Sequence, residues 1–201
     1  MAGKILLSTA YLPPIEYFAS IKDAEEVSVE TEENYHKQTY RNRCYILSPS
    51  GPHWLSVPVY SGSLHKIKIK DIRIDYSKRW QQVHLRAIRS SYGSSPFFQY
   101  YYDDFENTIL KNYEFLLDLN MTLFEVILKI LALEKSISFT SDFLPAGNKE
   151  YDIRYKISPK NNNGFATRKY MQVFSNENGF VPGLSIIDLI FNMGTDSKIY
   201  I

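Results

Sequence analysis

Residues 4–30 read KILLSTAYLPPIEYFASIKDAEEVSVE, and this stretch decides the fold class. An apolar run from Lys4 to Thr9 ends in a Pro-Pro turn, helical spacing follows from Ile15 to Ile21, and a second short run extends from Val27 to Glu30. These periods predict a strand, a turn, a helix and a strand in that order. A helix between two strands is typical of the α/β class.

The next segment predicts a hairpin and an edge strand. The apolar runs from Cys44 to Leu47 and from Trp54 to Val59 are joined by Ser-Pro-Ser-Gly-Pro, which predicts a β-hairpin with a longer loop. Lysine and isoleucine alternate from Lys66 to Lys70, and Ile72 and Ile74 continue the pattern. Because strand side chains alternate between two faces, we expect an edge strand with one buried face here.

The period becomes helical after Ser77, so the middle of the chain is predicted to be mainly α. One face of the first helix carries Trp80, Val83, His84, Ala87, Ile88 and Ser91. Ser77 is the expected N-cap, and Gly93 is the expected end. Further helices are expected from Pro96 to Phe105, from Asn107 to Leu119 and from Leu123 to Leu133. Thr122 would cap the last of these in a capping box.

The C-terminal part predicts two more strands and a buried helix. Residues Ser136 to Phe139 and Tyr170 to Phe174 have strand character, and the polar segment between them is expected to be a loop or lid. Ser185 and Asp188 form a capping-box pattern before an all-apolar helix that ends at Gly194. Since no repeat or linker interrupts the chain, we predict one compact α/β or α+β domain over residues 1–201, with a mixed sheet and a helical middle segment.

Composition and charge exclude several classes of protein. The chain has 201 residues, with 23 Lys plus Arg against 22 Asp plus Glu, so no global field favours nucleic acid. No apolar stretch approaches the roughly 20 residues needed to cross a bilayer. With a single cysteine and no recognisable leader, we expect a cytoplasmic protein without membrane insertion. Its four histidines do not pair at metal-ligand spacing, so neither a metal nor another cofactor is expected.

His84 is the strongest candidate for a chemically active side chain. It lies on the apolar face of its predicted helix, one turn after Trp80, where burial would lower its pKa and keep the ring neutral, as a general base requires. The alternative is a core histidine that hydrogen-bonds a backbone carbonyl. Asp75 precedes the helix and is placed to orient an imidazole, although turn formation is the commoner role of a single aspartate.

The densest basic and polar run, residues 36–43, suggests a binding loop. Arg41 and Arg43 are suited to grip a carboxylate or phosphate, and strand alternation would put both on one face with Asn42 on the other. A solvated strand edge explains the same run. Cys44 would need an adjacent base to act as a nucleophile, whereas its apolar neighbours indicate a small buried residue.

Short motifs along almost the whole chain form one ordered pattern. They are Tyr11-Leu12-Pro13-Pro14 with Glu16-Tyr17-Phe18, Asn42-Arg43, Trp54 to Val59, Trp80 with His84, Tyr92 with Pro96-Phe97-Phe98, and Leu184 to Asn192. This pattern resembles the WbqC-like protein family of bacterial O-antigen and other surface-polysaccharide gene clusters. Where many members carry a Gly-rich segment with a tyrosine, this chain has Tyr151 to Arg154 and Ser158-Pro159-Lys160, so substrate choice is expected to differ.

The resemblance implies transfer of glycine or another acyl group during polysaccharide synthesis. The leading hypothesis is an acyl or aminoacyl transferase that decorates a sugar or nucleotide-linked sugar, using an activated acyl donor. Its catalytic residues would be His84 as base, Asp75 as orienting group and Tyr92 as donor to the oxyanion. Its substrate-binding residues would be Asn42, Arg43, Trp80 and Arg41.

The alternative hypothesis is a non-catalytic accessory or scaffold protein of the same pathway. It would bind a biosynthetic enzyme or carrier through Tyr100-Tyr101-Tyr102 and the loop at residues 161–163, since tyrosine is enriched at protein interfaces. A deep pocket at His84 would favour the transferase, and a flat apolar patch would favour the scaffold.

Overall fold

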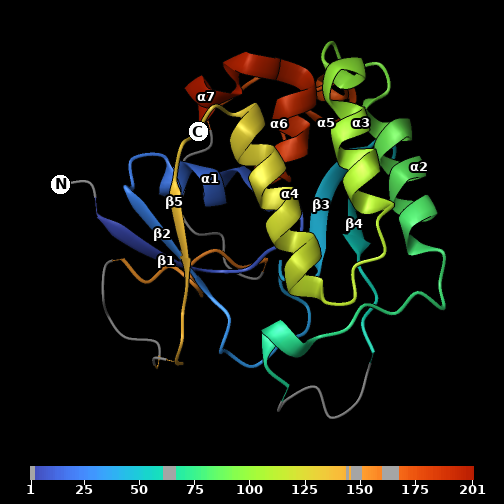
Figure 1. Cartoon of the computed structure of the whole chain (residues 1–201). Coiled ribbons are helices and arrows are strands. Elements are labelled where there is room, and N and C mark those ends of the chain that lie inside the picture. The colour runs from blue at the N-terminus through green and yellow to red at the C-terminus, as the bar shows by residue number, and fades with distance from the viewer. Residues whose placement is uncertain (1–2, 61–66, 144, 146–150, 160–167) are drawn as a thin grey trace.

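A three-stranded parallel sheet forms one side of the molecule (Figure 1). The computed structural model describes residues 3–60, 67–143, 145, 151–159 and 168–201. The sheet has the order β1 (Lys4–Ser8), β2 (Glu26–Glu30) and β5 (Ser136–Phe139). Helix α1 (Ile15–Ile21) connects β1 to β2, because parallel neighbours need a crossover rather than a tight turn. The predicted strand-turn-helix-strand opening is confirmed, and so is the strand at 136–139.

A two-stranded antiparallel hairpin forms a second, separate sheet. Its strands are β3 (Arg43–Ser48) and β4 (Gly51–Ser56). The predicted hairpin is confirmed, but the loop is shorter than expected, since only Pro49 and Ser50 separate the paired ends Ser48 and Gly51. Gly51 has a φ of +104°, which favours glycine at this turn.

The middle of the chain is mainly helical, as predicted, but its described residues form three helices instead of the four expected. They are α2 (Trp80–Tyr92), α3 (Phe98–Ile109) and α4 (Leu116–Ile130). The separate helix expected from Asn107 to Leu119 is wrong, because the chain leaves the helical conformation after Ile109 and a single helix then begins at Leu116. Gly93 caps α2, as expected, but Ser77 is not its N-cap, because the helix begins at Trp80 and Arg79 occupies the N-cap position. The predicted capping box at Thr122 is wrong, since Thr122 lies inside α4 and its hydroxyl donates to the Asp118 carbonyl.

The lysine-rich segment before α2 is not a strand. Residues Ile69–Asp71 form a short 3-10 helix, η2. The predicted edge strand is therefore wrong in its described part, and Lys66 lies outside the described residues. Lys68 and Lys70 both form ion pairs with Glu32, which tie the segment to the loop after β2. These tertiary contacts override the local alternation of lysine and isoleucine.

The strand predicted at 170–174 is also wrong. The Gln172 side chain accepts from the Val181 N–H at 2.9 Å and donates to the Val181 carbonyl at 2.8 Å, so a side chain takes the place of a strand partner. Helix α5 (Ser175–Asn178) follows directly. The loop or lid predicted between Phe139 and Tyr170 contains no helix or strand in its described part, and its residues 144, 146–150 and 160–167 lie outside the described residues.

The chain closes with α6 (Ile186–Met193), η3 (Gly194–Asp196) and α7 (Ser197–Tyr200). As predicted, α6 is buried on nearly all sides and is preceded by Ser185. However, the Ser185 hydroxyl donates to the Leu12 carbonyl rather than capping the helix. This bond joins the C-terminal helix to the connection between β1 and α1.

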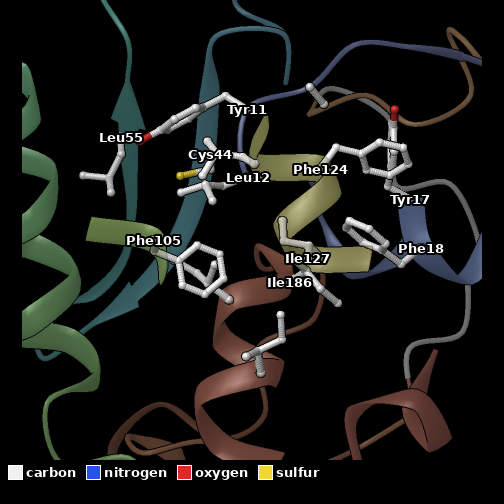
Figure 2. Close-up of a cluster of buried hydrophobic side chains, with 14 of the residues drawn as sticks. Tyr11, Leu12, Tyr17, Phe18, Cys44, Leu55, Phe105, Phe124, Ile127 and Ile186 are labelled. Carbon is white, nitrogen blue, oxygen red and sulfur yellow. The ribbon is translucent and has the colours of Figure 1, made fainter. Parts of the chain in front are cut away.

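One hydrophobic core joins both sheets and the helices. Figure 2 shows members of this core: Tyr11, Leu12, Tyr17, Phe18, Cys44, Leu55, Phe105, Phe124, Ile127 and Ile186. They come from the β1–α1 connection, the hairpin and helices α1, α3, α4 and α6, so each element contributes to the same buried cluster. The predicted mixed class, with parallel and antiparallel strands and a helical middle, is confirmed.

Candidate functional site

His84 projects from the buried face of α2 and is 3% exposed. The Tyr11 hydroxyl lies 2.9 Å from its Nδ1, and the Ser56 carbonyl accepts from the ring. Burial raises the pKa of the Tyr11 phenol well above 10, so this hydroxyl keeps its proton. Because a carbonyl oxygen only accepts, the N–H of the neutral ring is directed at Ser56, and Nδ1 accepts from the Tyr11 hydroxyl. The ring is thereby held with Nδ1 as acceptor and Nε2–H as donor, and both nitrogens are engaged.

The environment of His84 keeps the imidazole neutral. The pKa of His84 is lowered from 6.5 to about 4: burial lowers it most, the bond to Ser56 partly opposes this effect, and the nearby charge of His53 adds a smaller lowering. The expected depression of the pKa is therefore present. The only lone pair of the neutral ring already accepts the Tyr11 proton donor, which is the arrangement of a core histidine.

A cleft of about 450 Å³ opens between β4 and the start of α2. Its lining residues are Asn42, His53, Trp54, Leu55, Ser56, Val57, Pro58, Val59, Lys78, Arg79, Trp80, Val83 and His84. None of these residues, all within the described part of the chain, is acidic. Lys78 and Arg79 are exposed cations, so the cleft is suited to an anionic ligand.

Three residues predicted from sequence meet at this cleft: Asn42, Trp80 and His84. The Trp80 indole lies 5.1 Å from the His84 ring and 6.4 Å from the Tyr11 ring, in edge-on contacts. The Asn42 amide donates to the Val57 carbonyl at 2.9 Å. Neither Trp80 Nε1 nor Asn42 Oδ1, both buried, has a hydrogen-bond partner among the described residues.

Asp75 and Tyr92 are not partners of the His84 ring. The Asp75 carboxylate accepts from the backbone of Ser77 in a local turn, the commoner role considered for it. Tyr92 is 1% exposed, and its hydroxyl accepts from the Leu47 N–H at 3.1 Å. It follows His84 by eight helical residues, about 12 Å along the axis. The structure therefore uses Tyr92 to hold the hairpin against α2.

The two arginines of the basic run have different surroundings. Arg41 precedes β3 and is 4% exposed, and it forms a 2.6 Å ion pair with Glu33. Arg43 begins β3 and lies over the Trp54 ring at 5.8 Å, with no hydrogen-bond partner for its buried Nε among the described residues. The expectation that strand alternation aligns both is wrong, because Arg41 is not in the strand.

Cys44 is a buried core residue, as its neighbours indicated. Its side chain faces the core from β3 and is 0% exposed. Burial raises the pKa of its thiol far above the usual range, so the thiolate needed for nucleophilic attack is not formed near neutral pH.

Sequence reasoning missed two features. His53 is an exposed imidazole that lines the cleft from β4. A buried ion-pair cluster also lies at the carboxyl end of the parallel sheet, where Arg154 pairs with Glu30 and Asp152 at 2.6 Å. The signal was the acidic run Glu30-Thr31-Glu32-Glu33 at the carboxyl end of β2, because ligands and polar groups commonly gather at this end of parallel strands. In this structure the ion pairs connect the end of β2 to the segment that contains Asp152 and Arg154.

Within the described residues, no group of three or more His, Cys, Asp and Glu side chains could hold a metal ion. In the same residues, no helix combines the length and the apolar character needed to cross a bilayer.

Comparisons with known proteins agree with the motifs in the sequence. Residues 9–164 match the model of the WbqC-like protein family. The chain is also 25% identical over 228 residues to "Uncharacterized protein Rv1507c" of Mycobacterium tuberculosis (strain ATCC 25618 / H37Rv), covering 98% of this chain and 96% of that protein. No solved structure matches the chain significantly. Since the family match covers well over half of its length, the chain belongs to the WbqC-like protein family.

Proposed function

We propose that the protein is an acyl or aminoacyl transferase of bacterial surface-polysaccharide synthesis, and that it acts on a sugar or nucleotide sugar in the cleft between β4 and α2. The observation that carries this proposal is a cleft of about 450 Å³ lined by exposed cations and an exposed imidazole. That volume is within the roughly 300–1,000 Å³ of small-molecule sites. Lys78 and Arg79 suit a phosphate group of the ligand.

In this proposal His53, rather than His84, takes the proton from the attacking amine or hydroxyl. His53 is exposed in the cleft, whereas both nitrogens of His84 are occupied. His84 acts as a positioning residue, because its bonds to the Tyr11 hydroxyl and the Ser56 carbonyl hold α2 against the β1–α1 connection and β4. Asn42 and Trp80 also line the cleft.

The scaffold hypothesis is less well supported. Tyr100 is 76% exposed, but Tyr102 is 4% exposed and donates to Glu106 within α3. These tyrosines therefore do not form one continuous surface, and the loop at residues 161–163 lies outside the described residues.

The test is an activity assay with matched histidine variants. Protein, an acyl donor and a panel of nucleotide-linked amino sugars are incubated, and transfer is followed by mass spectrometry. His53→Gln should lower kcat by at least about 100-fold with an unchanged melting temperature, since general bases contribute roughly 10²–10⁴. His36→Gln, an exposed histidine outside the cleft, is the control and should retain activity. Full activity in His53→Gln would refute the assigned base, and absence of any sugar product would refute the transferase.

A further inference from the structure

The outer edge of β4 is only partly paired. Val57 N–H donates to the Asn42 carbonyl at 2.7 Å, so residues at alternate positions from 53 to 57 direct their backbone groups toward β3. Even-numbered residues point to the opposite edge. There the Pro58 carbonyl accepts from the Asp75 N–H at 2.9 Å, and the Tyr60 N–H donates to the Arg73 carbonyl at 3.1 Å.

On this outer edge, the backbone bonds to residues 73 and 75 do not continue from Pro58 back to Ser56 and Trp54, which line the cleft. The Ser56 carbonyl is taken by His84. Within the described residues, the Ser56 N–H and the Trp54 N–H and carbonyl form no hydrogen bond with another residue. These three backbone groups lie on residues that line the cleft. An unpaired strand edge of this kind accepts an extended, amide-bearing chain as an added strand.

The residues that line the cleft indicate which chemical groups a bound chain would have. Apolar side chains line much of it: Leu55, Val57, Pro58, Val59 and Val83. Lys78 and Arg79 stand at the start of α2, which has no side-chain N-cap, so the helix dipole adds to their positive charge. The ligand that fits is an extended chain with amides along its length and a phosphate at one end.

We infer that the cleft binds the phosphopantetheine arm of a coenzyme A thioester, which makes this thioester the acyl donor of the proposed function. The amides of the arm pair with the Ser56 N–H and the Trp54 carbonyl, and the diphosphate lies against Lys78 and Arg79. In the transfer, the donor carbon–sulfur bond breaks as a bond forms to the acceptor nitrogen or oxygen. The acceptor proton passes through His53 to the departing thiolate, which leaves as coenzyme A.

The test measures binding of coenzyme A to the full chain, independently of transfer. In ¹⁵N–¹H spectra, coenzyme A should shift the backbone amide signals of Trp54 and Ser56. Ser56→Pro removes the outward N–H at an edge position that tolerates proline, and it should weaken binding at least about tenfold, while the control Lys37→Ala, at an exposed residue that does not line the cleft, should leave the affinity unchanged. Lys78→Ala with Arg79→Ala should also weaken binding at least about tenfold.

If Ser56→Pro does not fold, the wild-type amide shifts decide the matter. The inference is overturned if coenzyme A does not bind, if it shifts other amides only, or if an acyl carrier protein binds while coenzyme A does not. Shifts at Ser56 caused by uridine diphosphate N-acetylglucosamine but not by coenzyme A would overturn it too, and would leave the proposed transferase standing with a different donor. Coenzyme A binding without any sugar product would support the inference and count against the function.

Discussion

Replacing His84 by glutamine should remove one specific pH dependence from the stability of the protein. Glutamine retains an amide donor for the Ser56 carbonyl and an acceptor for the Tyr11 hydroxyl, but it does not titrate. The wild-type ring has its pKa lowered from 6.5 to about 4, mainly by burial. The folded state therefore resists protonation of His84, whereas the unfolded state does not.

The sign and size of the effect follow from proton binding. Between pH 6.5 and pH 4 the unfolded state binds more protons at this site, so the free energy of unfolding falls as the pH falls. At about 1.4 kcal/mol per pH unit, the full loss is roughly 3 kcal/mol, with about 2 kcal/mol of it reached by pH 5. Above pH 6.5 the contribution is constant.

The assay is urea denaturation of wild type and His84→Gln at intervals from pH 4.5 to 7.5. The difference between the two proteins isolates His84 from other groups, including Asp188, whose pKa burial raises to about 6 and whose effect runs in the opposite direction. The stability advantage of wild type should shrink by about 2 kcal/mol between pH 7 and pH 5. A difference that stays constant over this range would show that the ring is not held neutral and would refute the reasoning.

Three further predictions concern residues outside the cleft. The free energy of unfolding of Asp188→Asn should increase relative to that of wild type by up to about 3 kcal/mol as the pH rises from about 4 to above 6, because burial raises the pKa of Asp188 and so disfavours its charged form. A difference in urea denaturation that does not depend on pH would contradict this. Gly194→Ala should lower the free energy of unfolding by about 1–3 kcal/mol, since φ is +57° and a Cβ would lie 2.5 Å from the Phe97 ring; an unchanged melting temperature would contradict it. Cys44 should react with a disulfide reagent such as Ellman's reagent only as fast as the chain unfolds, and rapid labelling of native protein would show an accessible thiolate.

Local patterns in the sequence were sufficient to predict most of the helices and strands. The strand-turn-helix-strand opening, the hairpin and the all-apolar C-terminal helix were predicted because their hydrophobic periods reflect faces that pack against one core. The same logic placed His84 on a buried helix face and predicted its lowered pKa. It failed at residues 67–70, where the ion pairs of Lys68 and Lys70 with Glu32 decide the backbone path.

The arrangement of the site was decided by tertiary structure. The sequence by itself determined the family, the class of fold and the neutral ring of His84, because these depend on motifs and on local burial. It did not reveal that Tyr11, 73 positions away, hydrogen-bonds that ring, or that residues on the open edge of β4 line one cleft with the start of α2. Hydrogen-bond partners and unpaired edges depend on which distant segments meet in space, and residue periods carry information only about their own segment.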